Sequence, residues 1–162
     1  MEHEVNVGRR EATFVMSSRR PVRLSEIGSV IGVAFGEIYG YLGARGGEPQ
    51  GPPFVIYHGM PQADEPFDVE ICAPVARAMD APSGWRVREL PAGTFATLLH
   101  IGPYDTVAAA HGALTAWLGA HDFVVTGPPR EVYLSPGDTP PEQIRTIVEL
   151  PVAHAPTPVA TT

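Results

Sequence analysis

The chain has 162 residues, a formal net charge of −7 at pH 7, and 11 basic residues that are all arginines. This length suits one compact domain, or two small modules that share a core. The acidic balance argues against a surface for nucleic-acid phosphates, which needs clustered basic side chains, and the lack of lysine excludes Schiff-base chemistry. We therefore expect no direct nucleic-acid binding and favour a cationic or neutral apolar partner.

The sequence favours a reducing compartment without membrane insertion. Cys72 is the single cysteine, so no disulfide can form within the chain. The first 13 residues lack the basic-then-apolar layout of a secretion signal. The most apolar stretch, residues 24–42, contains Glu26 and Glu37 and has helical amphipathicity, which argues against a membrane span. We expect a cytoplasmic protein with no membrane partner.

The first half of the chain predicts a strand, a long helix and two further strands. The helix is indicated by apolar residues spaced three and four apart, and glycines at 46 and 47 mark its end. Pro21 interrupts the chain before it, and β-branched or aromatic runs predict the strands. The predicted elements are the strand 11–17, the helix 24–44, the strands 54–58 and 67–72, and a linking strand 85–90.

The second half repeats this order of elements. A strand ends at Gly102-Pro103, an amphipathic helix follows, and two short strands come after it. Their ranges are the strand 94–101, the helix 106–121, and the strands 131–134 and 146–150. The last residues, 154–162, are rich in alanine, proline and threonine and predict a flexible tail.

An internal duplication follows from aligning the two halves. Pro53 matches Pro129 and Tyr57 matches Tyr133 within the same order of elements. We therefore predict an α+β fold in a single domain, residues 1–153, built from pseudo-repeats at about 9–76 and 85–153. The duplicated β-α-β-β modules would form one antiparallel sheet backed by two long helices.

This layout resembles the gyrase-inhibitor-like (GyrI-like) family, which includes the effector-binding domains of AraC-type and MerR-type regulators. The matching segments are PPFVIYHG, FDVEICAPV, ELPAGTFATLLHIGPYDTVAAAHGALTAWL and PREVYLSPGDTPPEQIRTIVELPV. The resemblance implies a duplicated fold of the SHS2 type with a central ligand cleft between its halves. Some members are fused to DNA-binding domains, whereas others stand alone and bind small molecules, restrain gyrase or hydrolyse cyclopropane-containing alkylators. Because the chain has no room for a helix-turn-helix domain, we expect a stand-alone member.

Glu131 is the sharpest candidate for a functional residue. Side chains two apart on a strand share a face, so Glu131 and Tyr133 lie on one side of the predicted strand. A carboxylate on an apolar strand is costly to bury unless it is paired. It either faces a ligand cation or a water that it activates, or it faces solvent and pairs with Arg130 or Arg145. The resemblance implies the first, with contact to cationic drugs or, in the hydrolase branch, catalysis by Glu131 and Tyr133.

Aromatic residues supply the rest of the predicted cleft. Tyr57 and Tyr133 occupy equivalent strand positions, and Phe35 and Tyr39 lie one helical turn apart. Their rings suit planar or cationic ligands, although core packing explains Phe35 equally well. The complete set of candidate ligand-binding residues is Glu131, Tyr133, Tyr57, Tyr39, Phe35, Trp85 and Tyr104.

Small residues recur every four positions on both predicted helices. Four glycines inside a helix carry a substantial local cost, about 1 kcal/mol each against alanine. The rows either let backbones approach closely, leave space for a bulky ligand, or reflect composition alone. Their members are Gly28, Gly32, Gly36 and Gly40 on the first helix, and Ala108, Gly112, Ala116 and Ala120 on the second.

The sequence indicates neither a metal site nor a cofactor. The six histidines show no metal-ligand spacing with acidic residues or with Cys72, and His111 and His121 lack a third partner. The first functional hypothesis is a protein that binds a drug-like, apolar or cationic small molecule. The alternatives are a hydrolase of electrophilic natural products that uses the same glutamate, and a module that interacts with gyrase or with a regulator protein.

Overall fold

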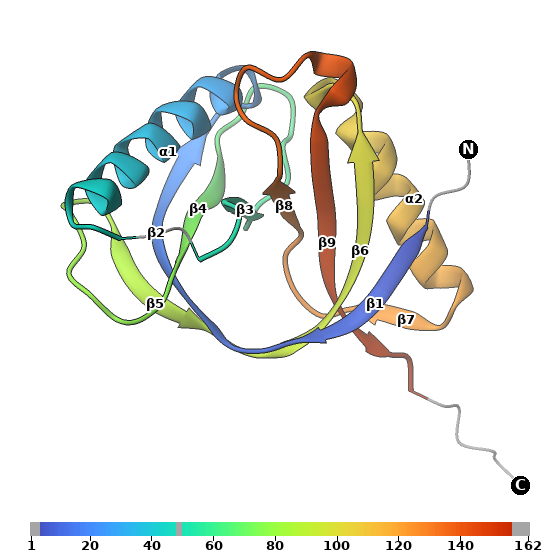
Figure 1. Cartoon of the computed structure of the whole chain (residues 1–162). Coiled ribbons are helices and arrows are strands. Elements are labelled where there is room, and N and C mark those ends of the chain that lie inside the picture. The colour runs from blue at the N-terminus through green and yellow to red at the C-terminus, as the bar shows by residue number, and fades with distance from the viewer. Residues whose placement is uncertain (1–3, 48–49, 157–162) are drawn as a thin grey trace, which may run out of the picture.

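A computed structural model describes residues 4–47 and 50–156, and within them nine strands form an antiparallel sheet with two α-helices packed on it (Figure 1). The strand order is β1-β6-β9-β8-β3-β4-β2-β5, and β7 pairs with β9. This confirms the predicted α+β class. The strands are β1 (Val5–Arg10), β2 (Thr13–Val22), β3 (Phe54–Tyr57), β4 (Phe67–Val75), β5 (Arg86–Leu90), β6 (Gly93–Ile101), β7 (Phe123–Val125), β8 (Arg130–Tyr133) and β9 (Arg145–His154). The helices are α1 (Ile27–Ala44) and α2 (Val107–Ala120), and short 3-10 turns cover Leu24–Glu26, Tyr104–Thr106 and Pro141–Gln143.

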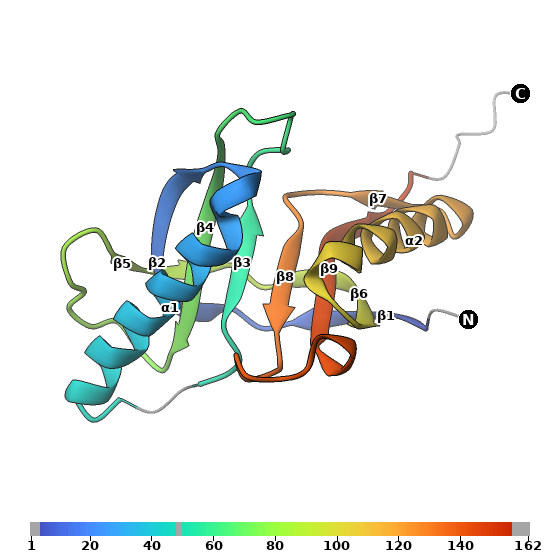
Figure 2. The ribbon, with the colours of Figure 1, turned by 90° about the horizontal axis from the view of Figure 1, so that it is seen from above.

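The two halves meet where β3 pairs with β8. Figure 2 shows these strands between the two helices. Tyr57 donates its backbone N–H to the carbonyl of Pro129 at 2.9 Å, and Tyr133 donates to Pro53 at 3.0 Å. Because these two bonds are symmetric, they place both tyrosines at equivalent positions of their halves. The predicted equivalence of Tyr57 and Tyr133 is thereby confirmed.

The outer strands are exchanged between the halves. β1 pairs with β6, from Val5 opposite Leu98, whereas β2 pairs with β5, from Thr13 opposite Leu90. The same register runs through both pairings, so the strands form one long antiparallel ribbon that passes from one half to the other (Figure 1). β5 therefore completes the sheet of the first half, and β1, which the sequence did not predict, completes that of the second. The pseudo-repeat boundaries stay a prediction.

Both helices pack on the sheet through residues four apart. α1 buries Ala34, Ile38 and Leu42, and α2 buries Ala110, Leu114 and Leu118. This spacing is the apolar stripe of an amphipathic helix. Position 34 matches 110, 38 matches 114 and 42 matches 118, so the helices are equivalent in the two halves.

By length and composition, the segment Leu24–Ala44 is apolar enough to cross a membrane, with a mean hydropathy of 1.3. In this structure it lies on the sheet, with Val33 and Leu24 among its exposed side chains. Glu37 accepts a hydrogen bond from the Trp85 indole at 3.2 Å.

Two predicted segment boundaries differ in the structure. Pro21 does not interrupt β2, because the strand runs on to Val22 and pairs with β4 throughout. His154 does not begin a flexible tail: it is the last residue of β9, lies opposite Phe123 and stacks on its ring at 4.6 Å. Of the predicted tail, residues 157–162 lie outside the described residues.

The glycine row of α1 does not serve close packing. Gly28, Gly32, Gly36 and Gly40 are exposed, and a Cβ added at any of them would meet nothing within 4 Å. The small residues of α2 are exposed as well. The expectation that these rows face each other or the sheet is therefore wrong, and the suggestion that they leave space for a ligand stays a prediction.

Replacing Gly32 and Gly36 with alanine should stabilise the protein by about 1 kcal/mol each, because alanine is the better helix former and both sites are open. Urea unfolding followed by circular dichroism measures the gain. Gly46→Ala is the matched control and should destabilise, since Gly46 has a φ of +68°. A double variant no more stable than the wild type would contradict this explanation.

Candidate functional site

Glu131 lies at the centre of a polar cluster on the helix-bearing side of the β3–β8 junction. Its Oε1 accepts hydrogen bonds from the Tyr57 hydroxyl at 2.9 Å and the Tyr133 hydroxyl at 3.0 Å. The two hydroxyl oxygens are 3.2 Å apart. Because the tyrosines hold equivalent positions in the two halves, they meet on one carboxylate at the pseudo-twofold junction. The alternative pairing of Glu131 with Arg130 or Arg145 is not found among the described contacts.

His111 of α2 completes the cluster from the helix side. Its Nε2 lies 2.8 Å from Oε2 of Glu131, and the two side chains are 27% and 14% exposed. The sequence patterns led us to weigh His111 only as a metal ligand, and they did not predict its contact with Glu131. A signal was available, because His111 stands three residues before the buried Leu114, as Phe35 stands before the buried Ile38. Both side chains therefore project from the same flank of equivalent helices.

Aromatic rings surround Tyr133. The Phe35 ring of α1 meets it edge-on at 6.1 Å, and Tyr104, before α2, does so at 5.8 Å. Tyr39 lies next to Phe35 at 6.4 Å, and its hydroxyl is buried without a hydrogen-bond partner in the described part of the chain. Five of the predicted aromatic residues therefore gather at the Glu131 cluster: Tyr57, Tyr133, Phe35, Tyr39 and Tyr104.

In the first half of the fold, Phe67 joins the site although the sequence did not predict it. Trp85 was predicted to join the site but lies elsewhere. Phe67 stacks on Tyr57 at 6.5 Å with an angle of 18° between the planes. Trp85 instead donates to Glu37 and packs under the guanidinium of Arg20. These contacts and its 7% exposure make Trp85 a core residue of the first half, and its assignment to the site is not supported.

Burial keeps the two tyrosines protonated. It raises the pKa of Tyr57 above its ordinary value, and the charge of Glu131 raises it further. Burial likewise raises the pKa of Tyr133, together with the neighbouring Tyr57 and Glu131. Both phenols therefore remain hydrogen-bond donors at neutral pH.

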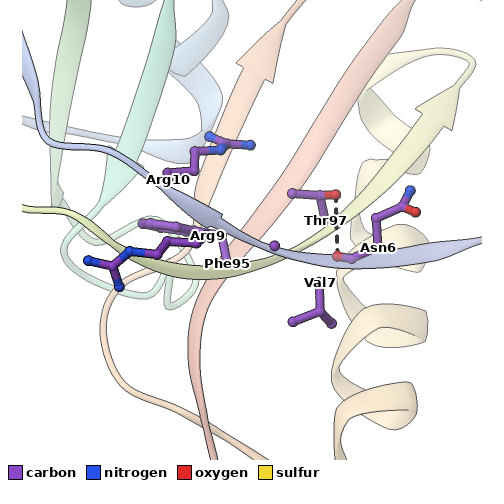
Figure 3. Close-up of a pocket in the computed structure, with 7 residues that line it drawn as sticks. Asn6, Val7, Arg9, Arg10, Phe95 and Thr97 are labelled. Carbon is purple, nitrogen blue, oxygen red and sulfur yellow. Dashed lines mark hydrogen bonds between the residues drawn. The ribbon is translucent and has the colours of Figure 1, made fainter.

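Side chains of the protein contact both oxygens of Glu131, and the Glu131 side chain is 14% exposed. Two surface cavities lie elsewhere on the described part of the chain, and neither is lined by the Glu131 cluster. One, of about 160 Å³, lies along β1 and β6 beside Arg10 and Phe95 (Figure 3). The other, of about 380 Å³, lies beside Arg130, between the start of β6 and the end of β9. Neither of these two cavities is the predicted central cleft.

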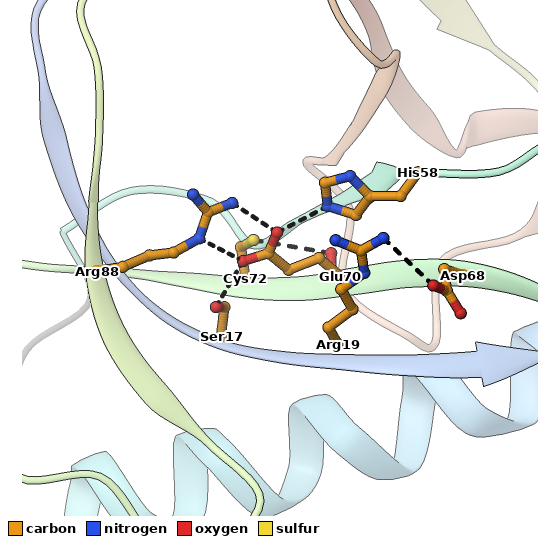
Figure 4. Close-up of polar contacts among 7 residues, drawn as sticks. All are labelled: Ser17, Arg19, His58, Asp68, Glu70, Cys72 and Arg88. Carbon is orange, nitrogen blue, oxygen red and sulfur yellow. Dashed lines mark hydrogen bonds and ion pairs between the residues drawn. The ribbon is translucent and has the colours of Figure 1, made fainter.

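A second buried carboxylate, Glu70 of β4, has a different environment (Figure 4). Arg88 donates two hydrogen bonds to it at 2.6 and 2.7 Å, Ser17 donates one at 2.7 Å, and His58 lies at 2.8 Å. Burial by itself would raise the pKa of Glu70, but these hydrogen bonds outweigh burial and lower it to about 2. Glu70 itself is only 1% exposed, and its contacts with Ser17 and Arg88 join β4 to β2 and β5.

Within residues 4–47 and 50–156, no group of three or more histidine, cysteine, aspartate or glutamate side chains could hold a metal ion. Cys72 is buried, and burial raises the pKa of its thiol. Such a thiol is a poor nucleophile, because the thiolate is the reactive form.

Comparison with known proteins gives one family and several structures of the same fold. A model of the GyrI-like small molecule binding domain matches residues 3–153. The crystal structure of the EcmrR C-terminal domain has a TM-score of 0.79 and 22% identity, and the match covers 96% of this chain and all of that one. In a cryo-EM structure of the EcmrR–DNA complex, the match covers 94% of this chain and 58% of the longer EcmrR chain, with a TM-score of 0.81 and 22% identity.

Two further structures are more distant in sequence. SAV2435 bound to tetraphenylphosphonium has a TM-score of 0.66 and 15% identity, over 94% of both chains. A hydrolase from Listeria innocua has a TM-score of 0.71 and 11% identity, over 93% of this chain and 92% of that one. At such identities the likeness shows the fold. A search of curated proteins found no significant match.

Proposed function

This chain belongs to the GyrI-like small molecule binding domain family, and we propose that its ligand is an apolar organic cation held at Glu131. The observation that carries the proposal is a carboxylate enclosed by aromatic side chains from both halves of the fold. Tyr57 and Tyr133 bind it, and Phe35 and Tyr104 pack around Tyr133.

Two interactions would stabilise a bound cation in such a site. The Glu131 side chain is 14% exposed, so water and salt screen its charge less than they would at the surface. The faces of the surrounding rings are electron-rich and attract positive charge. A neutral ligand of the same shape would gain only the apolar contacts, so the site should select for charge.

The proposal includes a route by which the ligand reaches the carboxylate. Tyr104 lies in the turn that precedes α2 and is 52% exposed. Its ring contacts the ring of Tyr133 edge-on. Rotation of Tyr104 away from the protein would uncover Tyr133. The ligand would then take the position of His111 beside Oε2 of Glu131. Support for the ligand class comes from SAV2435, which was solved with the apolar cation tetraphenylphosphonium.

Calorimetric titration with tetraphenylphosphonium and with the neutral triphenylphosphine oxide tests the proposal. We expect the cation to bind about tenfold more tightly or better, which corresponds to about 1.4 kcal/mol. Amide chemical shifts should move at His111, Glu131 and Tyr133. Equal affinity for the two compounds, or shifts confined to other residues, would refute the proposal.

A hydrolase that uses the same glutamate is the second candidate, favoured by the histidine and phenols that contact Glu131. General-base catalysis would need Glu131 to accept a proton from water. In this arrangement its oxygens already accept hydrogen bonds from Tyr57 and Tyr133 and contact His111, so a water molecule would have to replace one of these partners before Glu131 could act on it. We therefore favour binding. Turnover of a cyclopropane-containing alkylator, lost in Glu131→Gln, would favour catalysis instead. Interaction with gyrase stays a prediction of the family resemblance.

A further inference from the structure

We propose a second ligand site, on the face of the sheet opposite Glu131, that binds a small organic carboxylate with a flat apolar body. The site is the cavity of about 380 Å³ lined by Arg130, Phe95, Pro151 and Val152. Its volume lies within the range of small-molecule pockets, about 300–1,000 Å³. It is independent of the cation site and has the opposite preference for charge.

Strand alternation separates the two sites. Arg130 and Glu131 are neighbours on β8, and successive side chains of a strand point to opposite faces of the sheet. Glu131 faces the helices, where His111 of α2 contacts it. Arg130 faces the other side, where its guanidinium lies over the rings of Phe95 at 4.6 Å and Phe54 at 5.6 Å.

Arg130 has hydrogen-bonding capacity that the protein leaves unused. Its Nε is buried and has no hydrogen-bond partner among the described residues. A buried donor without a partner costs about 1–3 kcal/mol, so such donors point to an additional group in the working protein. A carboxylate matches this donor best, because it accepts two parallel hydrogen bonds from a guanidinium.

The adjacent carboxylate of the protein is already engaged. Glu149 of β9 lies opposite Arg130 in the sheet and is 1% exposed. Its Oε1 accepts a hydrogen bond from Arg10, whereas its Oε2 is buried without a partner in the described chain. Arg10 is thus the hydrogen-bonded partner of Glu149, and no described hydrogen bond or ion pair joins Arg130 to it. The positive charge left over favours a ligand with a single negative charge.

The cavity walls select a flat ligand. Phe95 and Pro151 supply apolar surface next to the guanidinium. Gly127 lies so close to Pro151 that an added Cβ would stand 3.1 Å from its Cγ, so the cavity is narrow at that wall. The guanidinium carbon of Arg130 lies 4.6 Å from the centre of the Phe95 ring. An aromatic carboxylate can lie along this wall with its charge beside the guanidinium.

Titration with 2-naphthoate, compared with its neutral analogue 2-naphthamide, tests the proposal. We expect naphthoate to bind the wild type about tenfold more tightly than naphthamide, and Arg130→Gln to abolish this difference. Arg145→Gln, at an exposed arginine of β9, and Glu131→Gln should both retain it. If Glu131→Gln keeps the preference for naphthoate over naphthamide, the carboxylate site does not depend on the cation site at Glu131. Either proposal can then be refuted without affecting the other.

Chemical-shift mapping on the wild type makes the test independent of the variant's folding. Naphthoate should shift the amide signals of Gly93, Gly127 and Ala153, which line the cavity, and leave those of His111 and Tyr104 unchanged. The proposal is overturned if naphthoate does not bind, if the amide analogue binds equally well, or if the shifts lie in the Glu131 cluster.

Discussion

Replacement of Glu131 with glutamine is expected to weaken tetraphenylphosphonium binding by roughly 30-fold, about 2 kcal/mol. Glutamine keeps the size of the side chain, and its amide oxygen can still accept hydrogen bonds from Tyr57 and Tyr133. The variant should therefore fold like the wild type and lose only the negative charge. Calorimetric titration of both proteins under the same salt conditions measures the effect.

Glu89→Gln is the matched control for this experiment. Glu89 is an exposed residue of β5, at the edge of the sheet, and its replacement changes the net charge by the same amount. We expect this variant to bind the cation like the wild type. Wild-type affinity in Glu131→Gln would mean that the ligand does not use this carboxylate, and equal losses in both variants would indicate a general charge effect.

Glu70→Gln should be the most destabilising of these substitutions, by about 3 kcal/mol at pH 7. A pKa lowered from 4.5 to about 2 corresponds to about 3 kcal/mol of stabilisation of the ionised form. The variant also leaves Arg88 without its charged partner, and breaking such a buried pair is costly. Urea unfolding at pH 7 measures the loss of free energy of unfolding.

The pH dependence of stability provides a second readout of the same pair. Because the pKa of Glu70 is lower in the folded state, its contribution is complete above about pH 4.5 and is lost as the pH falls toward 2. The difference between the wild type and Glu70→Gln should therefore shrink across this window. Glu142→Gln, at an exposed glutamate, should show no such convergence. A difference that stays constant down to pH 2 would contradict the assigned role of Glu70.

Local patterns in the sequence determined most of the secondary structure. The spacing of apolar residues predicts α1 and α2, because one face of each helix must contact the sheet, as Ile38 and Leu114 do. The matching positions of Tyr57 and Tyr133 predicted their equivalence for a similar reason, since a duplicated strand keeps its register. Alternation along β8 also placed Glu131 and Tyr133 on one face.

Contacts between distant segments were decided only by the tertiary structure. β1 has few apolar side chains and forms because β6 offers it an unpaired edge, which no local pattern records. The partners of Glu131 and Glu70 come from strands and helices far apart in sequence: His111 lies 20 residues from Glu131, and Arg88 lies 18 from Glu70. Periodicity identifies which face of an element is buried. Which charged groups meet across that face depends on how the two halves are joined.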